Sequence, residues 1–387
     1  MRLAADWLDA PGTRAVMDTL QRGGHGGWFV GGCVRNGLIG APVHDIDITT
    51  DARPDRVMAL AKAAGIKAVP TGIDHGTVTL VARGRPYEIT TLRRDLATDG
   101  RRATVAFTDW LEEDAARRDF SMNALYATAD GTVLDPTGAG LADLTARRLR
   151  FIGRPEDRIA EDYLRILRFF RFHAWYADPA GGIDAEALAA CAALSDGIAR
   201  LSRERVGAEM KKLLTAPDPA PAVAAMAQSG VLAQTLPGAD ARLLPILIAV
   251  EIAVEDVPPD PIRRLAALGG ADVAERLRLS KAEQRNLETL RTCMADTTAP
   301  GALAHAHGAV AAWDIVLLRA ALFETPPDPA ARDEIAKGAA AVFPVKPADL
   351  MPDLQGPELG AALKALESRW IASGFTLTRD QLLLTRR

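Results

Sequence analysis

The stretch FVGGCVRNGLIGAPVHDIDITT, residues 29–50, decides the fold that the sequence predicts. Residues 28–30 end a short apolar strand, Gly31 and Gly32 break it, and residues 33–39 fit one or two helical turns. A glycine turn lets backbone N–H groups approach an anion closely, and a helix N-terminus adds partial positive charge. This strand–turn–helix unit therefore predicts a phosphate cradle.

The residues that follow the helix alternate in the pattern of a second strand, over residues 44–49. Side chains two apart on a strand share a face, so Ile46 and Ile48 point into a core while Asp45 and Asp47 lie together on the other face. Mg2+ is usually held by one or two carboxylates plus substrate phosphates. The pair therefore predicts a Mg2+ site beside the cradle.

One arginine lies within the predicted cradle. Arg35 stands in the first helical turn after Gly31 and Gly32. A guanidinium can bind a phosphate through two parallel hydrogen bonds. These three residues are therefore predicted to bind a nucleotide.

The segments GGCVRN and VHDIDI, in this order, resemble the signature of the polymerase-beta-type nucleotidyltransferases. More narrowly, they are similar to the family of class II tRNA nucleotidyltransferases (CCA-adding enzymes) and bacterial poly(A) polymerases. One departure is Asn36, where the family usually has aspartate. That aspartate is not a metal ligand in the family, so the resemblance implies a local change in helix capping or in Arg35 orientation, with activity kept.

Composition limits the class of protein. The 387 residues are 48% hydrophobic and 25% charged, with a net charge of −4, which is ordinary globular composition and argues against a non-specific nucleic-acid coat protein. Three widely spaced cysteines predict reduced thiols in a cytoplasmic protein. No signal pattern is present, and the longest apolar run, residues 243–250, is too short to span a membrane.

A third acidic residue follows in a predicted hairpin of residues 77–82 and 86–91, whose second strand carries Glu88. The resemblance implies that Glu88 is a catalytic partner of the aspartate pair. The alternative is a cross-strand partner for an arginine.

Residues 92–107 are polar and lack periodicity, so a mobile loop is predicted there. The family has a flexible loop at this place that helps the switch from adding C to adding A. The full length of the loop and its Arg93-Arg94-Asp95 sequence argue against an enzyme that adds only CC. The alternative is a solvated surface loop.

A helix is predicted from residue 109 through RRDFSMNAL, residues 117–125. Adjacent residues of opposite charge cannot form a same-face helix pair, but they can reach different parts of one ligand. The resemblance implies that Arg118 contacts phosphate, that Asp119 contacts the ribose hydroxyl and that Asn123 supports both. The alternative is a charged helix start.

The chain is almost purely helical from residue 155 onward, and its second strong motif is EDYLRILRFFRF, residues 161–172. Charged residues recur there at three-residue steps, which predicts one helix face that carries Asp162, Arg165, Arg168 and Arg171. The alternative is a salt-bridged solvent face. The resemblance identifies the segment with the family's base-reading helix.

The chemistry of the first two residues agrees with base reading. A carboxylate only accepts hydrogen bonds and a guanidinium only donates them. Cytosine and adenine both present an amino donor beside a ring-nitrogen acceptor, whereas uracil and guanine present the reverse. Asp162 and Arg165 would therefore accept CTP or ATP, and Arg168 and Arg171 would hold phosphate or the far side of the base.

An α+β fold follows from this order of elements: a polymerase-beta-like head with a mixed sheet, then an all-α neck, body and tail. The predicted domains are a catalytic head over residues 1–153, a base-reading and RNA-binding neck over 154–215, and a tRNA-binding body and tail over 216–387.

The predicted reaction adds CCA to the 3′ end of tRNA from CTP and ATP, with Mg2+, without a nucleic-acid template and with release of pyrophosphate. The alternatives are a poly(A) polymerase and a partial enzyme that adds only A. A catalytically silent RNA-binding protein would have lost Asp45 and Asp47, which are present. A small-molecule nucleotidyltransferase would not need a base-reading helix.

Overall fold

The computed structural model describes residues 1–98 and 103–384 and divides into two compact units. The first unit consists of Met1–Leu213 with Pro221–Thr235, and the second of Leu214–Ala220 with Leu236–Arg387. The first unit holds both the predicted head and the predicted neck. The boundary between them at residue 153 therefore stays a prediction.

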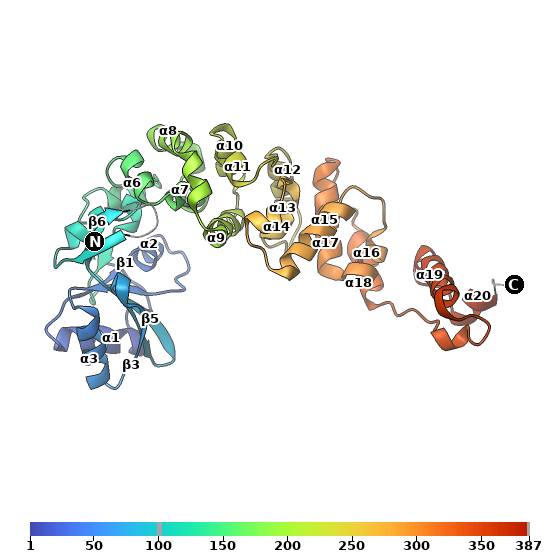
Figure 1. Ribbon diagram of the computed structural model, residues 1–387, viewed down its shortest axis with the longest axis horizontal. Coiled ribbons are helices and arrows are strands. Elements are labelled where there is room, and N and C mark those ends of the chain that lie inside the picture. The colour runs from blue at the N-terminus through green and yellow to red at the C-terminus, as the bar shows by residue number, and fades with distance from the viewer. Residues whose placement is uncertain (99–102, 385–387) are drawn as a thin grey trace. The chain divides into compact units, whose positions relative to one another are not determined.

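A seven-stranded mixed sheet forms the centre of the head, in the order β3-β4-β5-β2-β1-β8-β9 (Figure 1). Its strands are β1 Gly27–Val30, β2 Asp47–Thr50, β3 Lys67–Gly72, β4 Thr77–Ala82, β5 Arg85–Thr91, β8 Tyr126–Ala127 and β9 Val133–Leu134. Strands β2 and β5 run parallel, and the other neighbours are antiparallel. The parallel pair brings residues from two distant segments into register.

Burial follows the predicted alternation over residues 45–48, although Thr49 and Thr50 at the end of β2 are both buried. Ile46 and Ile48 are 2% and 1% exposed, whereas Asp45 is exposed and Asp47 is partly exposed. The strand itself begins only at Asp47, so the predicted strand over residues 44–49 is shorter at its start. The two aspartates therefore stand where the chain enters the sheet.

Three helices accompany the sheet in the first half of the head: α1 Pro11–Arg22, α2 Gly32–Leu38 and α3 Pro54–Ala63. Helices α1 and α3 lie side by side (Figure 1), and both also pack against β4. Proline occupies the first turn of both, where its missing N–H would have no intrahelical acceptor. A single 3-10 turn, η1 Ile73–His75, joins β3 to β4.

The prediction of a loop over residues 92–107 is wrong. Strands β6 Arg93–Thr98 and β7 Ala103–Phe107 pair antiparallel in a separate two-stranded sheet. Backbone hydrogen bonds build such a ladder, so a polar sequence without apolar alternation can adopt it. Four residues of the predicted loop lie outside the described residues: Asp99, Gly100, Arg101 and Arg102.

The prediction of one helix from residue 109 to residue 125 is also wrong. Helix α4, Leu111–Ala116, ends before the motif, and only a 3-10 turn, η2 Ser121–Asn123, follows. Phe120 is extended between them, is fully buried and forms an isolated bridge with Phe151. Burial of this aromatic pair, whose ring centroids are 4.8 Å apart, overrides the local helical pattern.

The rest of the first unit is helical. Its elements are α5 Gly140–Thr145, α6 Pro155–Glu161, α7 Leu164–Tyr176, η3 Pro179–Gly181, α8 Ala185–Ala193, η4 Ser195–Arg200, α9 Arg203–Leu214, α10 Ala220–Gln228 and α11 Val231–Thr235. The last residue of α9 and the first residue of α10 belong to the second unit. The predicted continuous base-reading helix is interrupted, because Asp162 has φ −154° and ψ 105°. Its carboxylate accepts the N–H of Leu164 at 3.1 Å, which competes with helix continuation.

The regular structure described in the second unit from residue 236 onward is helical, apart from one isolated bridge between Ala239 and Gly269. They are α12 Leu243–Ala253, α13 Pro261–Leu268, α14 Val273–Arg276, α15 Lys281–Cys293, α16 Pro300–His307, α17 Ala309–Leu322, α18 Ala331–Ala340, η5 Pro347–Asp349, α19 Gly356–Ala372 and α20 Arg379–Leu384. The last elements bury a small core around Leu366, Trp370 and Leu382. Within the described residues, no helix is long and apolar enough to cross a membrane.

Candidate active site

The three predicted catalytic carboxylates lie on or just before the neighbouring central strands β2 and β5. Asp47 opens β2 and lies in register with Glu88 on the parallel neighbour β5. Asp45 precedes Asp47 by two residues, and both Asp45 and Glu88 are exposed. The structure thus brings together acidic residues that are 41 positions apart in the chain.

Asp47 has an unusual electrostatic environment. Burial raises its pKa to about 6, and the nearby charges of Glu88 and Asp45 add to this effect, while Arg118 opposes it. A surplus of negative charge at a partly buried carboxylate fits a bound cation. No cluster of three or more His, Cys, Asp or Glu in the described part of the chain is placed to hold a metal ion alone. Substrate oxygens would therefore have to complete the metal's ligands.

The predicted glycine turn lies beside Arg118. Gly31 has φ +70°, a left-handed conformation that glycine adopts without strain. Its own N–H is donated to the carbonyl of Leu125 at 3.2 Å, so it is already engaged. Gly32 begins α2, whose first-turn N–H groups lack intrahelical acceptors. A Cβ on Gly31 would lie 3.6 Å from Nη1 of Arg118, which shows that the two residues line the same space.

Arg35 points into the protein. Its Nη1 donates to Oδ1 of Asn123 at 2.5 Å, its Nη2 donates to the hydroxyl of Tyr176 at 2.8 Å, and its guanidinium lies 3.9 Å from the Tyr176 ring centroid. Asn36 accepts from Nε and Nη2 of Arg35 and donates to the carbonyl of Pro42. Arg35 therefore joins the turn to α7, and its contact with phosphate stays a prediction.

The motif residues Asp119 and Asn123 continue this network. Nδ2 of Asn123 donates to Asp119 at 3.1 Å, and Arg168 from α7 donates to the other carboxylate oxygen at 2.7 Å. Burial alone would raise the pKa of Asp119, but Arg168 and Asn123 outweigh it and lower the pKa to about 2. Asp119 is therefore an ionised carboxylate that links the head motif to the predicted neck.

Of the predicted charged face, Arg165, Arg168 and Arg171 lie on α7, but Asp162 does not. Asp162 lies in the break before α7 and pairs with Arg205 of α9 at 2.6 Å. Arg165 pairs with Glu161 at 2.5 Å and also donates to the carbonyl of Arg117. The charged residues are thus drawn to separate partners, because partners from other elements compete with same-helix neighbours.

Arg171, the last residue of the predicted face, is also drawn away from it. Its Nε donates to Glu209 of α9 at 2.5 Å, and its guanidinium lies 4.3 Å from the ring centroid of Phe172. Both charged side chains are largely buried. Arg171 therefore fastens α7 to α9, and its predicted contact with a nucleotide stays a prediction.

Several residues that shape the site are not apparent in the sequence. Glu161, four positions before Arg165, follows the helical pairing rule and could have been found from spacing. Asp114 stands three and four positions before Arg117 and Arg118, so the same spacing rule marks it. The remaining residues contact the site from farther away in the sequence, and no local pattern marks them: Tyr126, Tyr176, Arg205 and Glu209.

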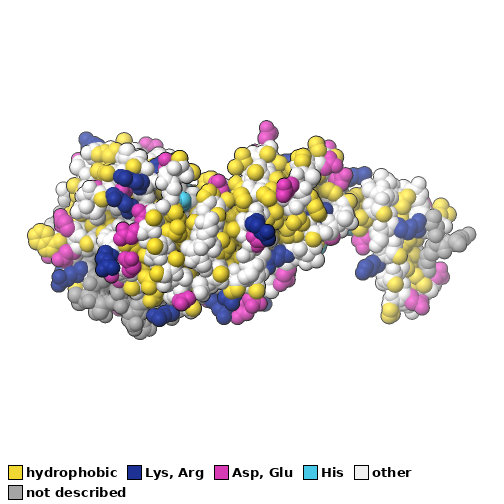
Figure 2. All heavy atoms as spheres, turned by 90° about the horizontal axis from the view of Figure 1, so that it is seen from above, with side chains coloured by type: hydrophobic (Ala, Val, Ile, Leu, Met, Phe, Trp, Pro, Cys, Tyr) yellow, Lys and Arg dark blue, Asp and Glu magenta, His cyan; other side chains and the backbone are white. Residues whose placement is uncertain are grey.

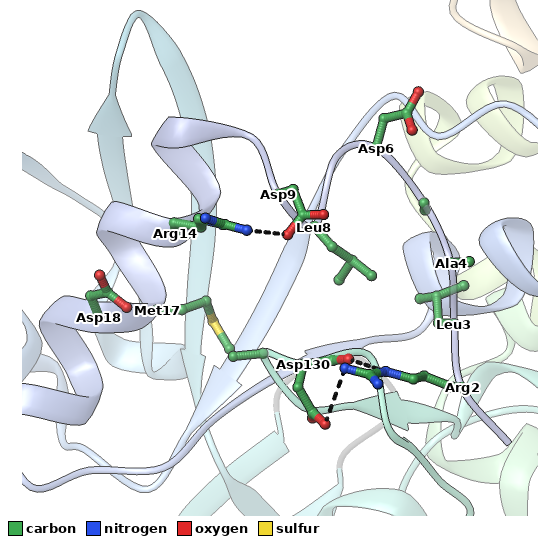
Figure 3. Close-up of a pocket in the computed structure, with 12 residues that line it drawn as sticks. Arg2, Leu3, Ala4, Asp6, Leu8, Asp9, Arg14, Met17, Asp18 and Asp130 are labelled. Atoms are coloured by element: carbon green, nitrogen blue, oxygen red, sulfur yellow. Dashed lines mark hydrogen bonds and ion pairs between the residues drawn. The ribbon is translucent and has the colours of Figure 1, made fainter.

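A hollow of about 810 Å³ beside the N-terminal segment is a separate feature (Figure 3). Figure 3 shows two ion pairs among its side chains, Arg14 with Asp9 and Arg2 with Asp130, and draws Asp6 and Asp18 without a partner among the residues shown. None of the predicted site residues lines it. The carboxylate cluster on β2 and β5 is therefore the better candidate for the active site.

Comparisons with known proteins agree with this geometry. The family model described as "Poly A polymerase head domain" matches residues 27–150, which include the glycine turn and all three carboxylates. A second model, "Probable RNA and SrmB- binding site of polymerase A", matches residues 182–243.

Curated relatives extend the similarity over nearly the whole chain. The mitochondrial CCA tRNA nucleotidyltransferase 1 of Mus musculus is 33% identical, over 97% of this chain and 90% of its own length. The chain belongs to the CCA-adding tRNA nucleotidyltransferase family. Another member, the CCA-adding enzyme of Levilactobacillus brevis, is 41% identical over 53% of this chain and 50% of its own length.

Solved structures of CCA-adding enzymes share the fold. The enzyme of Bacillus stearothermophilus in complex with CTP aligns with a TM-score of 0.79 at 28% identity, over 97% of both chains. The enzyme of Thermotoga maritima complexed with tRNA aligns with a TM-score of 0.70 at 18% identity, which shows the fold alone. The predicted α+β architecture with a polymerase-beta-like head is therefore confirmed.

Proposed function

We propose that this chain adds CCA to the 3′ end of tRNA by nucleotidyl transfer from CTP and ATP, with release of pyrophosphate. The observation that carries the proposal is the register of Asp47 with Glu88, next to Asp45, on strands that the family's head model covers. The identity of 33% to a CCA tRNA nucleotidyltransferase along almost the full length supports the same substrates.

Nucleotidyltransferases of this kind use a divalent metal, and we propose Mg2+ held by Asp45 and Asp47. When bound, the metal supplies charge stabilisation for the attacking and leaving oxygens. Asp47 is suited to this role because its pKa of about 6 leaves it mostly ionised at neutral pH. Glu88 adds a third negative charge beside the pair, and we propose that it is catalytic too.

Binding of the nucleotide is assigned to the residues around the turn. Arg118 lies beside Gly31, and its charge acts on Asp47, so it would bind a phosphate of the nucleotide there. Arg168 and Asn123 hold Asp119 in place. Its ionised carboxylate would accept a hydrogen bond from the ribose hydroxyl. Gly32 begins α2, and the first-turn N–H groups of α2, which lack intrahelical acceptors, would donate to phosphate oxygens.

Base selection is proposed for Asp162 and Arg165, without a nucleic-acid template. The carboxylate is held by Arg205 and by the N–H of Leu164, and the guanidinium is held by Glu161. Side chains that are fixed before the nucleotide arrives discriminate bases better than free ones, because little ordering cost remains.

The cytoplasm is the proposed compartment. The three cysteines, Cys33, Cys191 and Cys293, are free and buried, which agrees with a reducing environment.

Extension of truncated tRNA tests this function. Three tRNA substrates, lacking CCA, CA or only A, are incubated with Mg2+ and each nucleotide, and the products are sequenced. We expect two C additions from CTP, one A from ATP only after CC, and no further growth. Long A tails from ATP alone, on any RNA, would favour a poly(A) polymerase, and A addition without C addition would favour a partial enzyme.

A further inference from the structure

A buried carboxylate outside the predicted site, Asp114 of α4, lies between two functional elements. Its side chain is 0% exposed, although its nearest acidic neighbours in the chain are not buried. A buried ionised group is costly unless it is paired and hydrogen-bonded, so its partners indicate its role.

One carboxylate oxygen of Asp114 accepts hydrogen bonds from Arg118 and from Tyr126. Its Oδ2 accepts from Nη2 of Arg118 at 2.9 Å and from the hydroxyl of Tyr126 at 2.8 Å. The Tyr126 hydroxyl in turn lies 3.1 Å from Nε of Arg118. The guanidinium is therefore held on two sides, at the place where it faces Gly31.

The other carboxylate oxygen of Asp114 accepts hydrogen bonds from Arg117 and from the start of β6, the first strand of the β6–β7 hairpin. Oδ1 of Asp114 accepts from Nη2 of Arg117 at 2.6 Å and from the backbone N–H of Arg93 at 3.4 Å. Nε of Arg117 also donates to the carbonyl of Arg93 at 3.1 Å. The first residue of β6 is thus bound to Asp114 through its backbone N–H and, through its carbonyl, to Arg117, which Asp114 also holds.

The charge state of Asp114 agrees with this arrangement. Burial alone would raise its pKa, but the guanidiniums of Arg118 and Arg117 outweigh burial and hold the pKa well below its usual range. Asp114 therefore stays ionised wherever the enzyme is folded, and its bonds to both arginines are charge-assisted.

We propose that Asp114 is a positioning residue that fixes Arg118 at the glycine turn and ties it to the root of the β6–β7 hairpin. The proposal rests on the proposed function, because it deepens the role given to Arg118. Asp114 itself touches no part of the turn. Its effect on the nucleotide is therefore expected to pass through Arg118.

Kinetics of four variants test the first half of the proposal: Asp114→Asn, Arg118→Lys, the double variant and the control Glu112→Gln, which removes an exposed charge from the same helix. In Asp114→Asn, the KM for CTP and for ATP should rise about tenfold while kcat changes less than threefold, the size of one lost charge-assisted hydrogen bond. The KM values of the double variant should not exceed those of the more impaired single variant, because both substitutions disturb the same contact. Glu112→Gln should match the wild type.

Hydrogen exchange tests the second half. The amide of Arg93 should exchange faster in Asp114→Asn than in the wild type, because its acceptor loses charge. It should be unchanged in Arg118→Lys, which leaves Oδ1 of Asp114 in place. Equal exchange at Arg93 in the wild type and in Asp114→Asn would overturn the link to the hairpin.

A merely structural role gives different results. Unchanged KM values in folded Asp114→Asn, or additive losses in the double variant, would overturn the positioning role. If Asp114→Asn does not fold, Tyr126→Phe removes one hydroxyl that contacts both Asp114 and Arg118, and the KM for both nucleotides should still rise about threefold. Wild-type protein that extends no truncated tRNA would contradict the proposed function instead.

Discussion

At the scale of single residues, Asp47 is partly buried and lies near other negatively charged side chains. Its pKa is raised to about 6, since burial and Glu88 outweigh the one opposing arginine. The folded protein therefore binds more protons than the unfolded chain between about pH 4 and about pH 6. Without metal, stability must fall as the pH rises through that window, and the loss persists above it.

Asp47→Asn tests this charge. In EDTA at about pH 8, the variant should be more stable than the wild type by about 1 kcal/mol, and the gain should vanish below about pH 4. Chemical denaturation at both pH values measures it. Asp18→Asn, on an exposed carboxylate of α1, is the control. Equal stability differences at the two pH values would contradict the raised pKa.

Asp162 tests base selection at the same scale. Asp162→Asn supplies a donor as well as an acceptor, so incorporation of UTP and GTP should increase relative to CTP and ATP. Competition among the four nucleotides on truncated tRNA measures the preference. The control is Asp157→Asn, an exposed residue on α6. An unchanged preference would mean that Asp162 forms a salt bridge with Arg205 but does not select the base.

At the scale of elements, the break between α6 and α7 sets where Asp162 lies. Tyr163 follows it and packs on η4, where a Cβ on Gly197 would come within 1.9 Å of the Tyr163 ring. The guanidinium of Arg200 lies 5.3 Å from the centroid of that ring. The start of α7 is therefore held by close packing against η4 as well as by ion pairs.

Gly197→Ala tests this packing. The added methyl must displace Tyr163, so the variant should lose about 1–3 kcal/mol of unfolding free energy and its KM for CTP should rise. Thermal unfolding and steady-state kinetics measure the two effects. Gly360→Ala, where a Cβ meets open space on α19, should be neutral or slightly stabilising. A neutral Gly197→Ala would show that the packing does not position α7.

Local patterns predicted the elements whose signal is contained within a few residues. Alternation around Ile46 and Ile48 placed the aspartate pair on one face, and the glycines marked the turn. The helix break at Asp162 could not be predicted, because the bonds that favour it come from Leu164 and from Arg205, 43 positions away. The spacing of Asp114 before Arg117 and Arg118 is a local signal that was missed, whereas its bonds to Tyr126 and to the backbone of Arg93 leave no local pattern.

At the scale of the whole molecule, charge is mixed. The net charge is −4, and on the face drawn in Figure 2 the basic and acidic side chains are interspersed. A tRNA ligand must therefore be bound through local groups of lysine and arginine. Each phosphate contact releases counterions, which makes affinity depend on salt.

Salt dependence follows from this account. Raising NaCl from about 50 mM to about 200 mM should increase the KM for tRNA much more steeply than the KM for CTP, because tRNA offers many more phosphates. Steady-state kinetics at several salt concentrations give both slopes. Equal slopes would mean that the chain makes few phosphate contacts with tRNA.

The central claim is that Asp45 and Asp47 are required for nucleotidyl transfer at the tRNA 3′ end, because they hold the metal ion. The most direct measurement is the single-turnover rate of C addition to tRNA lacking CCA, for Asp45→Ala, Asp47→Ala and the control Asp18→Ala. We predict losses of about 10³-fold or more in the first two variants with the fold intact, and a control rate within about twofold of the wild type. Near-normal rates in either Asp45→Ala or Asp47→Ala would contradict the account.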